Sequence, residues 1–286
     1  MGFAAYASWM LASLLFAGCP FGTLRRERSA LEEGLARVDD GIAARADRAA
    51  LDEACGLLDM LSLDADDPRL LARQAQCDYA LAYGYPEEAP SPSARYLEGR
   101  EHAWRCLTRE PAFAGVLTTT GGRMTVAAAA RIGPGQADCL RWLVATWARW
   151  LALEDPAACG IDLEPLGLLA VRSVELSGGS ERGEALGAAA LVSSLTPLPL
   201  GPDLEGAAER FHEAIGINPD DLTLRVDLAE RVYRPLGDLE RFRATLGVVA
   251  VSAPREDDPW ALENRRARER ARALLEADAP APDRAE

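Results

Sequence analysis

The chain has 286 residues, 49% of them hydrophobic and 27% charged, which is enough to bury a substantial core. Its formal net charge of −14 argues against nucleic acid as a partner, because a binding face must neutralise phosphates with cations. Apart from the two histidines, every basic residue is arginine. The absence of lysine excludes a Walker phosphate loop, a pyridoxal Schiff base and a kinase-type ATP site.

The N-terminus resembles that of a bacterial lipoprotein. Residues 3–17 form an apolar stretch of signal-peptide length, too short to span a membrane comfortably. The stretch ends in Leu15-Phe16-Ala17-Gly18-Cys19, which resembles a lipobox, although no Arg or Lys precedes it and Phe16 stands where leucine is usual. We therefore expect residues 1–19 to be a signal peptide, with Cys19 as the lipid attachment site. An ordinary secreted protein and a buried N-terminal helix are the alternatives.

The lipobox resemblance implies a location in the periplasm, on a lipid anchor in a bacterial membrane. Pro20 follows the cysteine where an aspartate would favour retention in the inner membrane. This favours the outer membrane. Several acyl chains would hold the protein there almost permanently, since each buried CH₂ stabilises binding by about 0.8 kcal/mol.

Five further cysteines follow, and no two of them form a CxxC pair that would indicate a zinc ribbon or a thioredoxin-like motif. Helical hairpins would bring Cys55 near Cys77 and Cys139 near Cys159, so these are the two disulfides we consider. With an odd number, at least one thiol, such as that of Cys106, stays free or pairs between chains. Small buried hydrophobic residues are the alternative interpretation.

Abundant alanine, leucine and arginine predict an all-α protein. Only residues 115–120 and 247–252 resemble strands, and residues 111–122 read as an irregular connection that Gly121 and Gly122 break. Aspartates at 203, 221 and 238 are suitable N-caps. Residues 277–286 are polar and indicate a disordered tail after a helical domain at 20–276. The expected helices span residues 25–44, 48–61, 70–83, 93–109, 136–153, 160–176, 185–194, 203–216, 221–233, 238–251 and 259–276.

A spaced pattern of three apolar residues and a proline occurs twice, shifted by 35 residues. Residues at i, i+4 and i+7 share one helix face, and a shift near 34 is the period of the tetratricopeptide (TPR) repeat. The pattern predicts TPR-like helical hairpins stacked into a compact α-α superhelical bundle. The residues are Ala207, Phe211, Ala214 and Pro219, then Phe242, Leu246, Val249 and Pro254, with an upstream match at Gly99, Ala103, Cys106 and Pro111.

Residues 136–176 interrupt the repeat as an aberrant central helix pair rich in tryptophan. Trp142, Trp147 and Trp150 lie on one predicted helix, beside Arg141. One interpretation is packing between helices. The other is an apolar pocket or pore wall that receives the apolar part of a ligand, with Arg141 meeting a carboxylate at its mouth.

The spacing of these tryptophans, the segment Gly201-Pro202-Asp203-Leu204-Glu205-Gly206-Ala207 and Asn264 before an arginine-rich last helix resemble the TatT family. This is the T component of TPR-associated tripartite ATP-independent periplasmic (TRAP) transporters. The resemblance implies a periplasmic homotrimer without catalysis or cofactor, whose helical bundles surround a central pore. Its partner would be a periplasmic solute-binding protein, and the pair would pass a substrate, hydrophobic in part, toward an ion-driven permease. Where the family has a Gly-Gly-Pro-His-type run, this chain has Gly178-Gly179-Ser180.

No residue pattern indicates catalysis or metal binding. His102 and His212 lie outside any HExxH motif, and Asp220-Asp221 more simply caps the following helix. We therefore expect a transport-associated binding protein that is not an enzyme. A general TPR-like lipoprotein that scaffolds envelope protein assembly is the alternative, and an enzyme without a recognisable motif is a third hypothesis.

Overall fold

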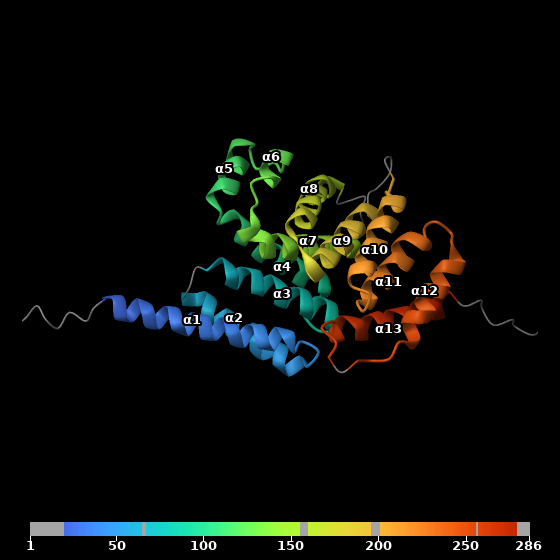
Figure 1. Cartoon of the computed structure of the whole chain (residues 1–286), viewed down its shortest axis with the longest axis horizontal. Helices are drawn as coiled ribbons and strands as arrows, with labels where there is room; N and C mark the ends of the chain where they lie inside the picture. The colour runs from blue at the N-terminus through green and yellow to red at the C-terminus, as the bar shows by residue number, and fades with distance from the viewer. Residues whose placement is uncertain (1–19, 65–66, 155–159, 196–200, 256, 279–286) are drawn as a thin grey trace, which may run out of the picture.

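A computed structural model describes residues 20–64, 67–154, 160–195, 201–255 and 257–278, and its regular elements there are all helical (Figure 1). The all-α prediction is therefore confirmed, while the TPR-like superhelical arrangement stays a prediction. In chain order the elements are α1 (Pro20–Ala43), α2 (Arg48–Asp64), α3 (Pro68–Gly84), α4 (Pro92–Thr108), α5 (Pro111–Thr119), α6 (Val126–Ala129), the short turn η1 (Pro134–Gln136), α7 (Ala137–Leu153), α8 (Gly160–Leu176), α9 (Gly179–Ser194), α10 (Leu204–Ile217), α11 (Leu222–Leu228), the π-helical turn η2 (Ala229–Tyr233), α12 (Leu239–Val251) and α13 (Ala261–Ala277).

The repeated apolar positions form the buried faces of α4, α10 and α12. Phe211 and Leu246, at equivalent positions of the pattern, are both fully buried, and each such side chain stabilises the fold by about 1.5–3 kcal/mol. Gly99 opens the upstream match and is also buried; a Cβ there would lie 2.9 Å from Cγ2 of Thr146 in α7. The pattern thus marks where helices approach one another closely.

The three predicted aspartate caps are present at α10, α11 and α12. Asp203, Asp221 and Asp238 each accept a hydrogen bond from a backbone N–H in the first turn of the helix that follows, at 2.9–3.0 Å. These bonds satisfy amide groups that the helix itself leaves unpaired.

Three segments differ from the prediction. Residues 111–119 form α5 rather than an irregular connection or a strand, because Glu110 caps the helix and Phe113 and Leu117, one turn apart, are buried together. Gly121 and Gly122 end this segment with φ of +65° and +80°, as expected of a glycine breaker. The second strand candidate lies mostly within α12, and α9 begins at Gly179 rather than at residue 185.

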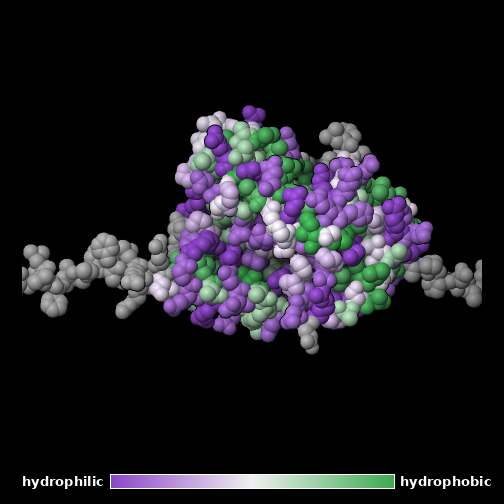
Figure 2. Space-filling view, viewed as in Figure 1, coloured by the Kyte–Doolittle hydropathy of each residue, from purple (hydrophilic) through white to green (hydrophobic). Residues whose placement is uncertain are grey.

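The helices enclose two groups of buried hydrophobic residues. The smaller joins α1, α2 and α3 and includes Leu262 of α13, so both ends of the described chain share one core. The larger runs from α3 through α7 and α9 to α13. In Figure 1, α1, α2 and α13 lie along one edge of the molecule and α5 and α6 at the opposite edge. Hydrophilic side chains cover much of the face in Figure 2, with hydrophobic ones in small groups among them.

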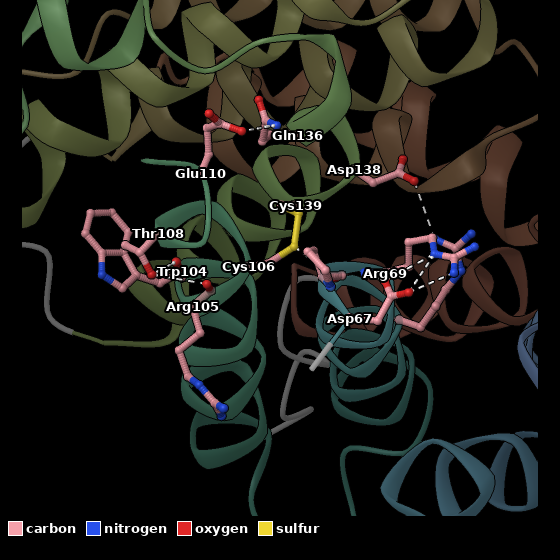
Figure 3. The surroundings of a disulfide bond; sticks show 12 residues. Asp67, Arg69, Trp104, Arg105, Cys106, Thr108, Glu110, Gln136, Asp138 and Cys139 are labelled. Atoms are coloured by element: carbon pink, nitrogen blue, oxygen red, sulfur yellow. Dashed lines mark hydrogen bonds and ion pairs between the residues drawn. A yellow bond between two sulfur atoms is a disulfide. The ribbon is translucent and has the colours of Figure 1, made fainter. Parts of the chain in front are cut away.

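Among the described residues, two disulfides connect neighbouring helices. Cys55 and Cys77 join α2 to α3, as predicted. The expected Cys139–Cys159 bond is wrong, because Cys139 is bonded to Cys106 (Figure 3). The end of α4 meets the start of α7 there, with the two Cα atoms 5.7 Å apart, within the range of a disulfide.

Some predictions concern residues that the structure does not describe. Residues 1–19, including Cys19, and Cys159 lie outside the described residues, as does the tail after residue 278. None of the helices that can be described combines the length and apolar character needed to cross a bilayer.

Candidate functional site

A cavity of about 100 Å³ lies where the central helices meet both ends of the described chain. Small side chains of α7 and α9 leave this space, and a Cβ on Gly187 would already overlap Leu224. The volume is enough for a few water molecules or a small ligand. The lining consists of Arg45, Tyr79, Arg141, Trp142, Ala145, Ala148, Arg149, Ser173, Glu184, Ala185, Gly187, Ala188, Leu191, Asp221, Thr223, Leu224, Asp227, Trp260 and Glu263.

Arg149 of α7 and Asp227 of α11 form a bidentate ion pair in this lining, with N–O distances of 2.9 and 2.6 Å. Burial alone would lower the pKa of Arg149, but the charge and hydrogen bonds of Asp227, together with Tyr79 and Tyr83, outweigh it and hold that pKa well above its usual value. The guanidinium carbon also lies 5.2 Å from the ring centre of Tyr83. The pair therefore fastens α7 to α11 as a fixed part of the wall.

Arg45 and Glu263 form a second pair across 218 residues of sequence. Nε of Arg45, in the turn between α1 and α2, donates to Oε1 of Glu263 at 2.8 Å, and its Nη2 donates to the carbonyl of Pro259 at 2.8 Å. Glu263 stands in the first turn of α13, where a carboxylate is favoured by the helix dipole. The other carboxylate oxygen, Oε2, is buried without a partner among the described residues.

Arg141 is bound by carboxylates of the protein itself. Nη1 donates to Glu184 at 2.8 Å, and Nη2 donates to Asp138 at 3.0 Å. Its guanidinium carbon lies 5.0 Å from the ring centre of Trp142. Arg141 is thus already paired with carboxylates of α7 and α9, while its meeting with a ligand carboxylate stays a prediction.

Asp221, the cap of α11, is a buried carboxyl in the same lining. Burial raises its pKa to about 7; hydrogen bonds from Thr223 act in the opposite direction, while the negative charges of Glu263 and Glu184 raise it further. Both the backbone N–H and the hydroxyl of Thr223 donate to Oδ1, at 3.0 and 2.6 Å. Near neutral pH this group therefore changes between its neutral and ionised forms.

Three buried polar atoms in this lining have no hydrogen-bond partner within the part of the chain that the structure describes. They are Oγ of Ser173, Nε1 of Trp142 and Oε2 of Glu263. A buried polar group left unsatisfied costs about 1–3 kcal/mol. Three such groups on residues of one lining make this cavity the candidate site for a hydrogen-bonding molecule.

The structure places only two of the four predicted pocket residues in this cavity, Arg141 and Trp142. Trp147 and Trp150 lie against α4, where the guanidinium carbon of Arg100 is 4.4 and 5.5 Å from their rings. Five residues along a helix rotate a side chain by about 140°, so Trp147 cannot share the wall that holds Trp142.

The prediction missed the charged residues contributed by distant helices. Arg149 stands next to Trp150 in the same helix, so a search for polar neighbours of the tryptophans would have found it. Nothing local distinguishes Arg45 or Glu263 from surface charges, and Asp221 was interpreted only as a cap.

The residues that carry the family resemblance have structural roles around the cavity. Oδ1 of Asn264 accepts from the N–H of Leu222 at 2.8 Å, and its Nδ2 donates to the carbonyl of Asp220 and to Asp258 at 2.9 and 2.8 Å. Asn264 thereby ties α13 to the start of α11. In the turn before α10, Gly201 has a φ of +74°, which glycine adopts without strain.

The histidines take part in isolated pairs. Nδ1 of His102 lies 2.9 Å from Asp78, and Nε2 of His212 lies 3.1 Å from the hydroxyl of Tyr233. No group of three or more His, Cys, Asp or Glu side chains suited to a metal ion occurs among the described residues.

Comparison with known proteins gives one family match. The model of a family described as TRAP transporter T-component matches residues 89–280, which is more than half of the chain. A comparison with curated proteins finds no match. The matched region contains every residue of the cavity lining except Arg45 and Tyr79.

Proposed function

Because the chain belongs to the family of TRAP transporter T-components, we propose that it works beside a periplasmic solute-binding protein and holds a small ligand in its central cavity. Its role is to bind and present, without catalysis. The chain would hand its ligand to, or receive it from, the solute-binding protein on the way to the permease.

The observation that carries the ligand part of this proposal is the set of unpartnered polar atoms around the cavity. Ser173, Trp142 and Glu263 each line the cavity, and each carries one such atom, respectively a hydroxyl, an indole N–H and a carboxylate oxygen. Leu191, Leu224 and the ring of Trp142 supply apolar surface beside them. A molecule with a polar head and an apolar part fits this lining better than a purely hydrophobic one.

We further propose that the protein is held in the periplasm by a lipid on Cys19, on the outer membrane. The lipobox-like sequence before Cys19 supports this. The two disulfides support it as well, because such bonds persist in oxidising compartments such as the bacterial periplasm. A homotrimer is proposed from the family resemblance.

Purification of the tagged full-length chain from membranes of its native host tests this function. We expect the solute-binding protein to be captured, and mass spectrometry of a solvent extract to find a small molecule. The Ala188→Leu variant fills the cavity from α9 and should lose the molecule while keeping its fold. Cys19→Ala should release the protein from the membrane.

A general scaffold for envelope protein assembly is the competing function. It predicts capture of assembly factors without any solute-binding protein, and an extract that the Ala188→Leu substitution leaves unchanged. That combination would overturn the transport proposal.

A further inference from the structure

We infer that the central cavity takes a small organic cation, a molecule that carries an ammonium group. The inference rests on the proposed function in assuming that the cavity holds a ligand, and it adds the ligand's charge. It follows from which polar groups of the lining are already satisfied and which are not.

The positive charges of the lining are already occupied. Arg149 is bound on two nitrogens by Asp227, and Arg141 by Asp138 and Glu184. Arg45 donates to Glu263 and to two backbone carbonyls. An anionic ligand would have to displace a carboxylate from a guanidinium and leave that carboxylate buried and unpaired, which is strongly unfavourable.

Carboxyl groups outnumber guanidinium groups in the lining, and the surplus group, Asp221, is partly ionised near neutral pH. Four carboxylates line the cavity, those of Glu184, Asp221, Asp227 and Glu263, against three guanidinium groups. Oε2 of Glu263 is buried and has no partner among the residues described. The whole Glu263 residue is only 8% exposed, so this oxygen is shielded from bulk water. An ammonium group supplies the hydrogen-bond donors that this oxygen lacks.

Asp221 strengthens the preference for a cation. Within the described ranges no guanidinium binds it; Thr223 is its hydrogen-bond donor, and Glu263 and Glu184 oppose its ionisation. A cation in the cavity would offset that repulsion and interact with two carboxylates at once.

The remaining groups define the rest of the ligand. Nε1 of Trp142 can only donate, so it needs an acceptor, and Oγ of Ser173 can donate or accept. A hydroxyl oxygen on the ligand would serve both. Trp260 and Tyr79 also line the space, and aromatic rings attract cations. An amino alcohol small enough for about 100 Å³ combines these features.

A charge series of similar-sized molecules tests the inference on the full-length protein. Ethanolamine carries a cation at neutral pH, ethylene glycol is neutral and glycolate is an anion. We expect calorimetric titration in sodium chloride buffer to give ethanolamine an affinity at least about tenfold above that of ethylene glycol, and no binding of glycolate. Excess sodium occupies any site that is unselective among cations.

Two variants locate the binding. Glu263→Gln keeps the acceptor for Arg45 but removes the charge, and it should weaken ethanolamine binding by at least about tenfold. Ala188→Leu should abolish binding through lost volume. Glu240→Gln, at an exposed glutamate of α12, is the matched control and should bind like the unmodified protein. Circular dichroism verifies that each variant is folded.

Each remaining outcome decides the question. Any of four results would overturn the cation inference. They are equal binding of ethanolamine and ethylene glycol, tighter binding of glycolate, binding of none of the three molecules, and full ethanolamine affinity in folded Glu263→Gln. Capture of the solute-binding protein is a separate measurement. The proposed transport role can therefore stand while the charge of the ligand is wrong.

Discussion

Replacing Asp221 with asparagine should stabilise the protein relative to the unmodified chain. This gain in the free energy of unfolding should be larger at alkaline pH than at acid pH. Asparagine is as good an N-cap as aspartate, so it can still accept the bond from Thr223. It cannot ionise. The substitution thus removes a buried charge while keeping the local structure of α11.

The size of the effect follows from the pKa shift. The pKa of Asp221 is about 7 in the folded protein, against 3.8 for a free aspartate. Between these values the unfolded chain has released the proton and the folded chain retains it, so stability falls as pH rises through this window. Because one pKa unit corresponds to about 1.4 kcal/mol, the Asp221→Asn variant should gain about 2–3 kcal/mol over the unmodified protein between pH 5 and pH 8.

Urea unfolding at several pH values from 5 to 8 measures this gain. Asp238→Asn is the matched control, because Asp238 caps α12 with the same type of bond but its side chain reaches solvent. Its effect on the free energy of unfolding should not grow with pH. If the Asp221→Asn and unmodified proteins kept a constant difference over the whole range, burial of an ionisable Asp221 would be refuted.

Three further substitutions or treatments test the packing around the cavity. Asn264→Ala removes three hydrogen bonds and leaves buried backbone groups unpaired, so the free energy of unfolding in urea should fall by about 2–4 kcal/mol; a loss below about 1 kcal/mol would contradict the tie between α13 and α11. Asp227→Ala leaves the Arg149 guanidinium buried and unpaired and should cost about 3–5 kcal/mol, whereas Arg149→Met with Asp227→Leu should recover most of that loss, as thermal melts of both can establish. Reduction of the disulfides, which join residues 22 and 33 apart in sequence, should lower stability by about 3–4 kcal/mol for each bond. An unchanged melting temperature in reductant would argue against both bonds.

The helices were largely predictable because their signals are local. Residues 160–176 were assigned without error as α8, and the aspartate caps at 203, 221 and 238 begin the helices expected of them. The helix α5 was missed because its glycine and β-branched residues have low helix propensity. Burial of Phe113 and Leu117 overrides that propensity, and burial depends on what the rest of the chain places beside them.

Of these disulfides, one could be predicted from local sequence and the other depended on the tertiary structure. The Cys55–Cys77 bond joins two helices that are consecutive in sequence, so a hairpin argument finds it. Cys139 has two possible partners by spacing alone, and its bond to Cys106 depends on α4 packing along α7. Sequence separation does not reveal which helices become neighbours when several elements lie between them.

The sequence by itself determined that this protein is helical and which faces of its helices are buried. Both depend on local signals, because the 3.6-residue spacing of apolar residues and the capping residue involve only positions close together in sequence. It also carried the spacings that match the T-component family. Only the tertiary structure decided that Arg45 meets Glu263 and that Asp221 is buried beside them. The charge balance of a cavity is a sum over distant segments, and no local pattern contains it.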